Sequence, residues 1–104
     1  MMVDGHRASQ LFKALSDPVR LELYVAIADR GEAIPVSDIP DVGVAQSTVS
    51  HHLRKLREAE LIEGSRNGSW VHYRAVPSAL DSVAEFIEAR RSTKLTLLEA
   101  DETA

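Results

Sequence analysis

Apolar residues recur at helical spacing near the start of the chain. The first stripe consists of Ala8, Leu11, Phe12 and Leu15. Its i, i+3, i+4, i+7 spacing is that of an amphipathic helix, which Ser16-Asp17-Pro18 interrupts. An Asp before a Pro favours a helix start, because the carboxylate can accept from free N–H groups and Pro has none to satisfy. We therefore predict a second helix from about Pro18 to Arg30, ended by Gly31.

This second helix is apolar around much of its circumference. One face carries Leu23, Tyr24 and Ile27, and the stripe is widened by Leu21, Val25 and Ala28. Such a pattern is typical of a central, largely buried helix. Prolines and a glycine between Ile34 and Val44 then leave room only for a short helix, which we place at about Ser37 to Asp41 with Ser37 as its cap.

The next helical pattern runs from Gln46 to Ala59. Val49, Leu53 and Leu56 fall on one face. The other faces carry mostly polar side chains, namely Gln46, Ser47, Ser50, His51, Arg54 and Arg57. The spacing predicts a helix with one packed side and an exposed surface rich in hydrogen-bond donors.

An extended stretch from about Ile62 to Ala75 follows, with Asn67-Gly68 as a strong two-residue hairpin signal. Alternation places Trp70, His72 and Arg74 on one side of the ribbon and Val71, Tyr73 and Ala75 on the other. Pro77-Ser78 then opens a last helix. Its apolar positions are Leu80, Val83, Ala84 and Ile87, and the period continues through Leu95 and Leu98.

The predicted order is helix, helix, short helix, polar-faced helix, two-stranded hairpin and helix. This is a mostly α fold with a small β-hairpin, in the α+β class. A short helix, a tight turn containing glycine and a polar-faced helix are typical of a helix-turn-helix unit, and the hairpin makes it a winged one. The helix from about Gln46 to Ala59 would enter the major groove of double-stranded DNA, with the wing from about Ile62 to Ala75 on the backbone or minor groove.

Composition fits a single domain over residues 1–104, with frayed tails at 1–6 and 99–104. Hydrophobic residues make up 44% and charged residues 27%, which is ordinary for a folded protein. No apolar run approaches the roughly 18 to 20 residues of a membrane span, and the N-terminus lacks a signal-peptide pattern, so we expect a cytoplasmic protein. The sequence has no cysteine, no glycine-rich phosphate loop and no nucleophile motif, so we do not expect an enzyme.

The charge is unevenly distributed. The formal net charge of -4 argues against a nonspecific nucleic-acid coat. The segment from Gly43 to Arg74 is nevertheless basic, whereas residues 1–42 and 95–104 are acidic. Phosphate contacts are therefore expected from the basic residues Arg54, Lys55, Arg66 and Arg74.

Three stretches resemble the ArsR/SmtB family of winged-helix repressors, and they occur in the family's order. They are Ala14–Leu21 (ALSDPVRL), the helix Gln46–Leu53 (QSTVSHHL) with its continuation Leu56–Ala59, and the wing Arg66–Arg74 (RNGSWVHYR). The resemblance spans most of residues 8–87. It implies a homodimer joined by the first and last helices, recognition helices in successive major grooves of a pseudo-palindromic operator, and release from DNA when an effector binds.

The family's order also assigns roles to side chains. Base or phosphate contacts are expected from Gln46, Ser47, Thr48, Ser50 and His51. The dimer interface is expected at Leu11, Phe12, Leu15, Leu80, Val83, Ala84 and Ile87, because these stripes exceed what one chain of 104 residues needs to cover. Trp70 and Tyr73 are isolated aromatics, and we expect them to pack and seat the wing rather than to stack on bases.

Both metal sites known in the family are incomplete. The family's Cys-Val-Cys-Asp-Leu motif corresponds to Pro35–Ile39, which has no cysteine, and Asp81-Ser82-Val83 lacks the histidine of the second site. Adjacent residues such as His51 and His52 point about 100° apart on a helix and cannot easily share an ion. We expect no tight metal site. His6 and His72 remain as weak candidates for a loosely held divalent ion such as Ni or Zn.

Two alternatives stay open at this point. The winged-helix fold could serve as a protein-interaction module, since a fold does not determine its function. The chain could also be a regulator whose response depends on a separate partner protein or on a non-metal ligand. A polar recognition face favours DNA, because a protein-binding surface there would be more apolar. The family also often has a capping Ser where this chain has Ala45, so the recognition helix could begin elsewhere.

Overall fold

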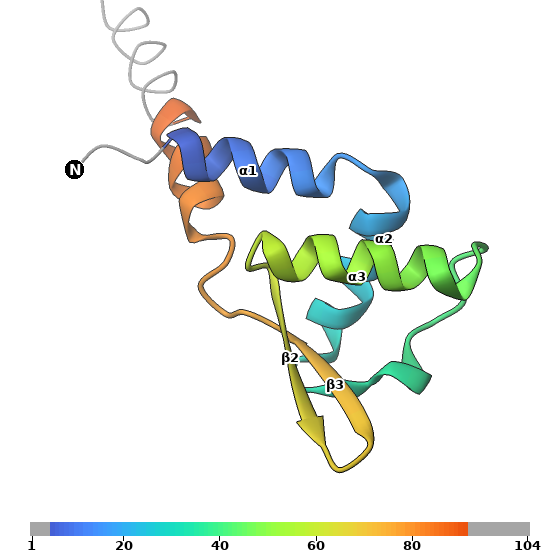
Figure 1. Cartoon of the computed structure of the whole chain (residues 1–104). Helices are drawn as coiled ribbons and strands as arrows, with labels where there is room; N and C mark the ends of the chain where they lie inside the picture. Colours follow the sequence, from blue (N-terminus) through green and yellow to red (C-terminus); the bar gives the residue numbers. More distant parts are fainter. Residues whose placement is uncertain (1–4, 92–104) are drawn as a thin grey trace, which may run out of the picture.

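In the computed structural model, which describes residues 5–91, the chain opens with α1 (Gly5–Leu15) and α2 (Pro18–Arg30) (Figure 1). The Asp17 carboxylate caps α2, accepting from the backbone N–H groups of Val19 at 2.9 Å and Arg20 at 3.1 Å. Gly31 ends the helix at φ 70°, a left-handed conformation that costs glycine nothing. The predicted limits of α2 are therefore confirmed at both ends.

Two boundary predictions need correction. α1 begins at Gly5, so Gly5 and His6 are helical and the predicted frayed tail at 1–6 is too long. The predicted short helix at Ser37–Asp41 is wrong, because the segment forms strand β1 (Ile34–Pro35) and the 3₁₀ turn η1 (Val36–Asp38). Pro40 holds Ile39 in an extended conformation, so the turn cannot propagate into a helix. The predicted tail at 99–104 lies outside the described residues.

The wing is the larger part of a small antiparallel sheet with the strand order β1-β3-β2. It consists of β2 (Ile62–Asn67) and β3 (Trp70–Ala75). Asn67 pairs with Trp70, so the two loop residues are Gly68 and Ser69 and not Asn67 and Gly68 as predicted. Gly68 takes φ 67°, which a primed hairpin turn requires. The sequence did not predict the pairing of β1 with β3, because two residues ending in Pro carry no strand signal.

Cross-strand partners share a face of the sheet, and this register gives the two sides of the wing different surroundings. Ile34 lies opposite Tyr73, and both face the core. Arg66 lies opposite Val71 on this same side of the ribbon. Trp70 and Asn67, which lie opposite each other, point to the other side, as the predicted alternation requires.

The core is formed by α1, α2, α3 (Gln46–Glu58) and the inner face of the sheet. Its most deeply buried side chains are Leu11, Leu23, Ile27, Ile34, Leu53, Leu56, Leu61 and Ile62. The prediction that Leu21 and Val25 widen the buried stripe of α2 is wrong, because the two side chains are 43% and 44% exposed. α1, α3 and β3 contact α2, and these two side chains lie outside those contacts.

Residues 81–91 form the last helix, after a turn at residues 77–80 where the sequence predicts that the helix begins. Figure 1 shows this helix beside the N-terminal part of α1, and the rings of Phe12 and Phe86 make an edge contact at 5.9 Å between centroids. The predicted continuation through Leu95 and Leu98 lies outside the described residues. No helix in the described part of the chain is long and apolar enough to cross a membrane.

The cap at Asp17 makes the stability of the fold depend on pH. The backbone N–H of Arg20, assisted by His52 and by the N–H of Val19, lowers the pKa of the Asp17 carboxyl. Its stabilisation is therefore complete above the unfolded pKa of about 3.9 and is lost as the pH falls through the lower folded value. We expect Asp17→Ala to lower Tm at pH 7, whereas Asp17→Ser, which keeps a cap but does not titrate, should lower it less.

Thermal unfolding followed by circular dichroism at pH 7 and below pH 4 checks this expectation. The wild-type Tm should fall more steeply on acidification than the Asp17→Ser Tm. An Asp17→Ala variant as stable as the wild type at pH 7 would show that the cap contributes nothing.

Candidate nucleic-acid interface

The outer face of α3 is formed by side chains three and four positions apart. The inner face of the helix is buried, at Val49, His52, Leu53 and Leu56. The opposite side carries Ser47, Ser50, His51 and Arg54, all of them exposed. The prediction of one packed and one polar face is therefore confirmed. Gln46 is also exposed, whereas Thr48 is half-buried at the edge of the packed face and offers less surface to a ligand.

His51 and Arg54 are neighbours on this outer face. Nη2 of Arg54 lies 3.1 Å from Nδ1 of His51. A guanidinium can only donate, so Nδ1 is the acceptor and the proton of the neutral imidazole lies on Nε2. That N–H is then available as a donor, which matches the N7 and O6 acceptors that guanine presents in the major groove.

α3 begins at Gln46, as predicted, although Ala45 supplies no side-chain cap. The backbone N–H groups of Thr48 and Val49 donate to the Ala45 carbonyl at 3.0 Å, so the helix is regular from its first turn. The first N–H groups of a helix without a side-chain cap remain available to an external acceptor. A phosphate beside Gln46 and Ser47 could satisfy them, and the positive end of the helix dipole would favour it.

The four basic residues expected to contact phosphate fall into two classes, those with an ion pair and those without one. Arg74 forms an ion pair with Glu63 across the wing, and Lys55 lies 3.6 Å from Glu58 on α3. Arg54 and Arg66 form no ion pair within residues 5–91 and are exposed. Of these four residues, the two without an ion pair thus lie on the outer face of α3 and near the tip of the wing.

Acidic residues are absent from most of α3 and from the outer part of the wing, and Glu58 ends α3. The sequence has no Asp or Glu between residues 42 and 57 or between residues 64 and 80. Glu63, at the base of the wing, is neutralised by Arg74. Residues 46–57 of α3 and residues 64–75 of the wing are thus two carboxylate-free segments in a chain whose formal net charge is -4.

Known proteins are similar to this chain in sequence and in fold. Residues 15–65 match a family described as a helix-turn-helix domain. The arsenical resistance operon repressor of Escherichia coli (strain K12) is 34% identical over 79 residues, covering 76% of this chain and 68% of that protein. The chain belongs to the ArsR/SmtB family of winged helix-turn-helix repressors. As a member of the ArsR family it is a DNA-binding transcriptional regulator, and the family consists of regulators rather than enzymes.

Solved structures agree with this membership. An ArsR-like transcriptional regulator from Rhodococcus sp. RHA1 has a TM-score of 0.74 at 24% identity, covering 91% of this chain and 89% of that one. The transcriptional repressor BigR from Xylella fastidiosa has a TM-score of 0.62 at 29% identity, covering 79% and 85% of the two chains. The winged helix-turn-helix architecture is therefore that of the ArsR family.

The two wing aromatics behave differently from each other. Tyr73 packs against the core and lies across Gly64, as predicted. The same prediction is wrong for Trp70, which is 57% exposed. The reason is the register, because Trp70 begins β3 on the outer side of the ribbon, where nothing in the described residues covers it.

The metal positions of the ArsR family do not hold a metal-binding set in this chain. Pro35 lies in β1, and Ser37 and Asp38 lie in η1, where the Asp38 carboxylate is 3.8 Å from Arg30. Within the described residues, no three His, Asp or Glu side chains are placed to hold a metal ion together, so neither His6 in α1 nor His72 in β3 belongs to such a group. The donor set does not fit a closed transition-metal site.

His52 was missed as a structural residue, because the sequence presents it only as a neighbour of His51. It is 8% exposed, and its Nε2 lies 3.9 Å from Oδ1 of Asp17, the cap of α2. Its buried Nδ1 has no hydrogen-bond partner in the described part of the chain. His52 therefore packs α3 against the start of α2 and does not belong to the exposed outer face of α3.

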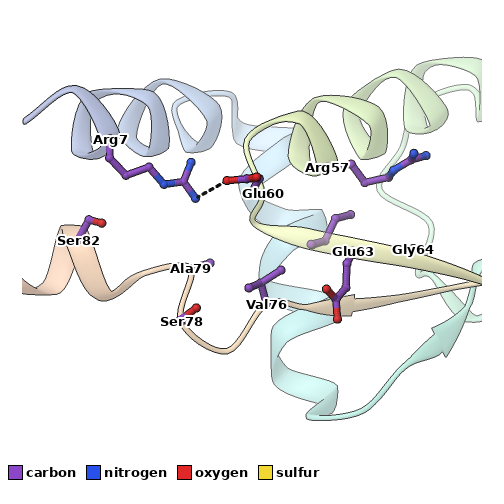
Figure 2. A pocket seen from close by; sticks show the side chains of 10 residues that line it. Arg7, Arg57, Glu60, Glu63, Gly64, Val76, Ser78, Ala79 and Ser82 are labelled. Atoms are coloured by element: carbon purple, nitrogen blue, oxygen red, sulfur yellow. Dashed lines mark ion pairs between the residues drawn. The ribbon is translucent and has the colours of Figure 1, made fainter. Parts of the chain in front are cut away.

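The C-terminal end of α3 is held by a residue from α1, which sequence reasoning also missed. Nη1 of Arg7 donates to the Ala59 carbonyl at 2.8 Å, and Nη2 lies 4.0 Å from the carboxylate of Glu60 (Figure 2). Glu60 has φ 59°, a conformation that usually favours glycine at this position of a helix end. This chain has Glu60 where glycine usually ends such a helix, so nothing in the sequence indicated this helix end. Arg7 thus connects α1 directly to the recognition helix.

Proposed function

We propose that this ArsR-family chain is a homodimeric repressor whose two α3 helices enter successive major grooves of a pseudo-palindromic operator. The wings would lie on the flanking backbone or minor groove. The observation that carries the proposal is the exposed polar face of α3, on which Ser47, Ser50, His51 and Arg54 all point away from the core and no carboxylate occurs before Glu58. Donors on one helical face suit base edges, whereas a protein-interaction face would be more apolar.

The proposed dimer interface is formed by α1 and the last helix. Phe12 on α1, Ile87 on the last helix and Leu80 in the turn before it are 45%, 43% and 38% exposed in the single chain, which is a high exposure for large apolar side chains. Ala84 is also exposed, and Leu15 and Val83 are half-buried. Leu11 has no exposed surface, so it belongs to the core and the proposed interface leaves it out.

Selection of bound sequences from random duplex DNA tests the proposal. The enriched motif should have dyad symmetry, with half-sites separated by about one helical turn or a multiple of it. A variant with Ser47, Ser50 and His51 all changed to Ala is the matched control and should enrich nothing. Failure of the wild-type dimer to enrich any motif would overturn the proposal and favour the protein-interaction alternative.

For the signal that releases the repressor, we propose a non-metal ligand or a partner protein. The proposal is supported by Pro35, Ser37 and Val83, which occupy the family's metal positions and cannot replace thiolates or imidazoles. A shift from mostly bound to mostly free needs several kcal/mol of differential affinity, which a loosely held ion at His6 or His72 does not supply.

Calorimetric titration of the dimer with Zn, Ni and Co measures this directly. We expect no stoichiometric site of nanomolar affinity and at most weak binding. A nanomolar site abolished by His6→Ala or His72→Ala would contradict the proposal. His51→Ala serves as the control for ions held at the surface.

A further inference from the structure

Trp70 is an exposed indole at the end of the wing. It is the only tryptophan of the chain, and at 57% exposure it is the most exposed large apolar side chain of residues 5–91. It is the first residue of β3 and lies opposite Asn67, beside the turn formed by Gly68 and Ser69. An indole combines a large apolar face with one N–H donor, so at an exposed loop tip it suits a partner that presents both apolar and polar groups.

A shallow hollow of about 490 Å³ lies beside the indole, between the wing and the start of the helix-turn-helix unit. It is lined by Pro35, Ser37, Asn67, Trp70 and His72. The lining thus offers a hydroxyl, an amide, an imidazole and an indole, and no carboxylate. The nearest acidic residue along the chain is Asp38, whose carboxylate pairs with Arg30.

We propose that Trp70 is a DNA-contacting residue, and that this hollow receives the sugar–phosphate backbone beside the sequence read by α3. The indole lies against a deoxyribose, whose C–H faces are apolar, while Ser37 and Asn67 offer neutral donors to the adjoining phosphate. This inference rests on the proposed function, since it adds a contact to the same protein–DNA complex.

The register of the wing strands determines which side chains could meet each backbone strand of the DNA. Arg66 and Trp70 lie on opposite sides of the ribbon, close to the same two-residue turn. A wing that enters the minor groove has a backbone strand on each side of it. Arg66 would then face one strand and Trp70 the other, so that the tip is held between a charge contact and an apolar contact.

Other occupants fit the surroundings less well. The proposed dimer elements, α1 and the last helix, lie away from the wing tip in Figure 1. A single-stranded nucleic acid would need successive aromatic side chains, and the described wing surface exposes only one. The segment 64–80 lacks acidic residues, and Arg66 is close in the chain, so the local charge favours a phosphate backbone.

Because Trp70 is unique, its fluorescence reports on this contact in the unmodified protein. The experiment uses the duplex enriched by the wild-type dimer, with binding followed separately by anisotropy of a dye on the DNA. At saturation we expect acrylamide quenching of Trp70 to fall several-fold. A duplex trimmed to the two half-sites should bind through α3 but leave the quenching as in the free protein.

Substitution gives a second, independent readout. Trp70→Ala should weaken binding to the full duplex by about tenfold and binding to the trimmed duplex by much less, while Trp70→Phe keeps part of the contact. Val25→Ser, which removes a similarly exposed apolar side chain from α2, is the matched control and should change neither.

The outcomes separate the inference from the proposed function. If the duplex binds by anisotropy while Trp70 stays as accessible to acrylamide as in the free dimer, the inference is overturned and the repressor proposal stands. If no enriched duplex binds at all, both are overturned. The quenching measurement needs no variant, so a poorly folded Trp70→Ala protein would not prevent a decision.

Discussion

Phe12→Glu combined with Ile87→Glu is expected to yield a folded monomer whose operator affinity is about a hundredfold or more below that of the wild type. The two side chains are 45% and 43% exposed in the single chain, so the substitutions do not disturb the core. In the dimer they would bury two unpaired carboxylates against an apolar surface, which is strongly unfavourable. A monomer contacts only one half-site and loses the avidity of two linked recognition helices.

Light scattering gives the mass, and anisotropy with the enriched duplex gives the affinity. Val25→Glu is the matched control, because Val25 is 44% exposed on α2, outside the proposed interface. It should leave both the dimer mass and the affinity unchanged. If the double variant remained a dimer at micromolar concentration, the interface would have to be sought elsewhere on the chain.

The sequence predicted correctly those helix ends that depend only on residues close by in the chain. Asp17 and Gly31 set the limits of α2 through a side-chain cap and a left-handed conformation, both of which involve only nearby backbone groups. The segment around Ser37 was mispredicted because Ile34 and Pro35 pair with β3, more than thirty residues later in the chain. A tertiary pairing of this kind leaves no periodic signal in a two-residue strand.

The part of the candidate site on α3 was predicted well, because helical periodicity defines it. The part on the wing was predicted poorly, because it depends on the register of the two strands. Ser47, Ser50 and His51 follow from helical spacing alone. The ion pair between Glu63 and Arg74 does not, because moving the turn by one residue changes the register of the strands by two. With a turn at Asn67 and Gly68, Glu63 would have faced His72, and Arg74 would have remained a free cation.

Two contacts that hold α3 and its C-cap against the rest of the chain could not be predicted from the sequence. His52 lies beside Asp17, and Arg7 reaches the Ala59 carbonyl, across 35 and 52 residues of chain respectively. Neither pair has a characteristic spacing. Both connect the recognition helix to α1 or to the start of α2, so they place the DNA-facing surface relative to the proposed dimer helices.

Ser50→Ala and His51→Ala are each expected to weaken binding to the enriched operator by about 1 to 3 kcal/mol, or about 5-fold to 150-fold. Both side chains are exposed on the outer face of α3, and the Nε2 proton of His51 is left free by the contact of Nδ1 with Arg54. Contacts to base edges carry the sequence information. Binding to random duplex should therefore change little, and the ratio of specific to nonspecific affinity should fall.

Arg66→Ala should behave differently, because a free cation at the wing tip serves a phosphate of any sequence. Affinity for operator and random duplex should fall alike, and the slope of log K against log salt should decrease by about 1. The double variant Glu63→Gln with Arg74→Gln is the control, since it removes an arginine already neutralised within the wing, and its salt slope should match the wild type. Anisotropy titrations over a range of salt concentrations compare the wild type with all four variants. If the α3 variants and Arg66→Ala weakened operator and random DNA to the same extent, the outer face of α3 would not be the surface that reads the bases.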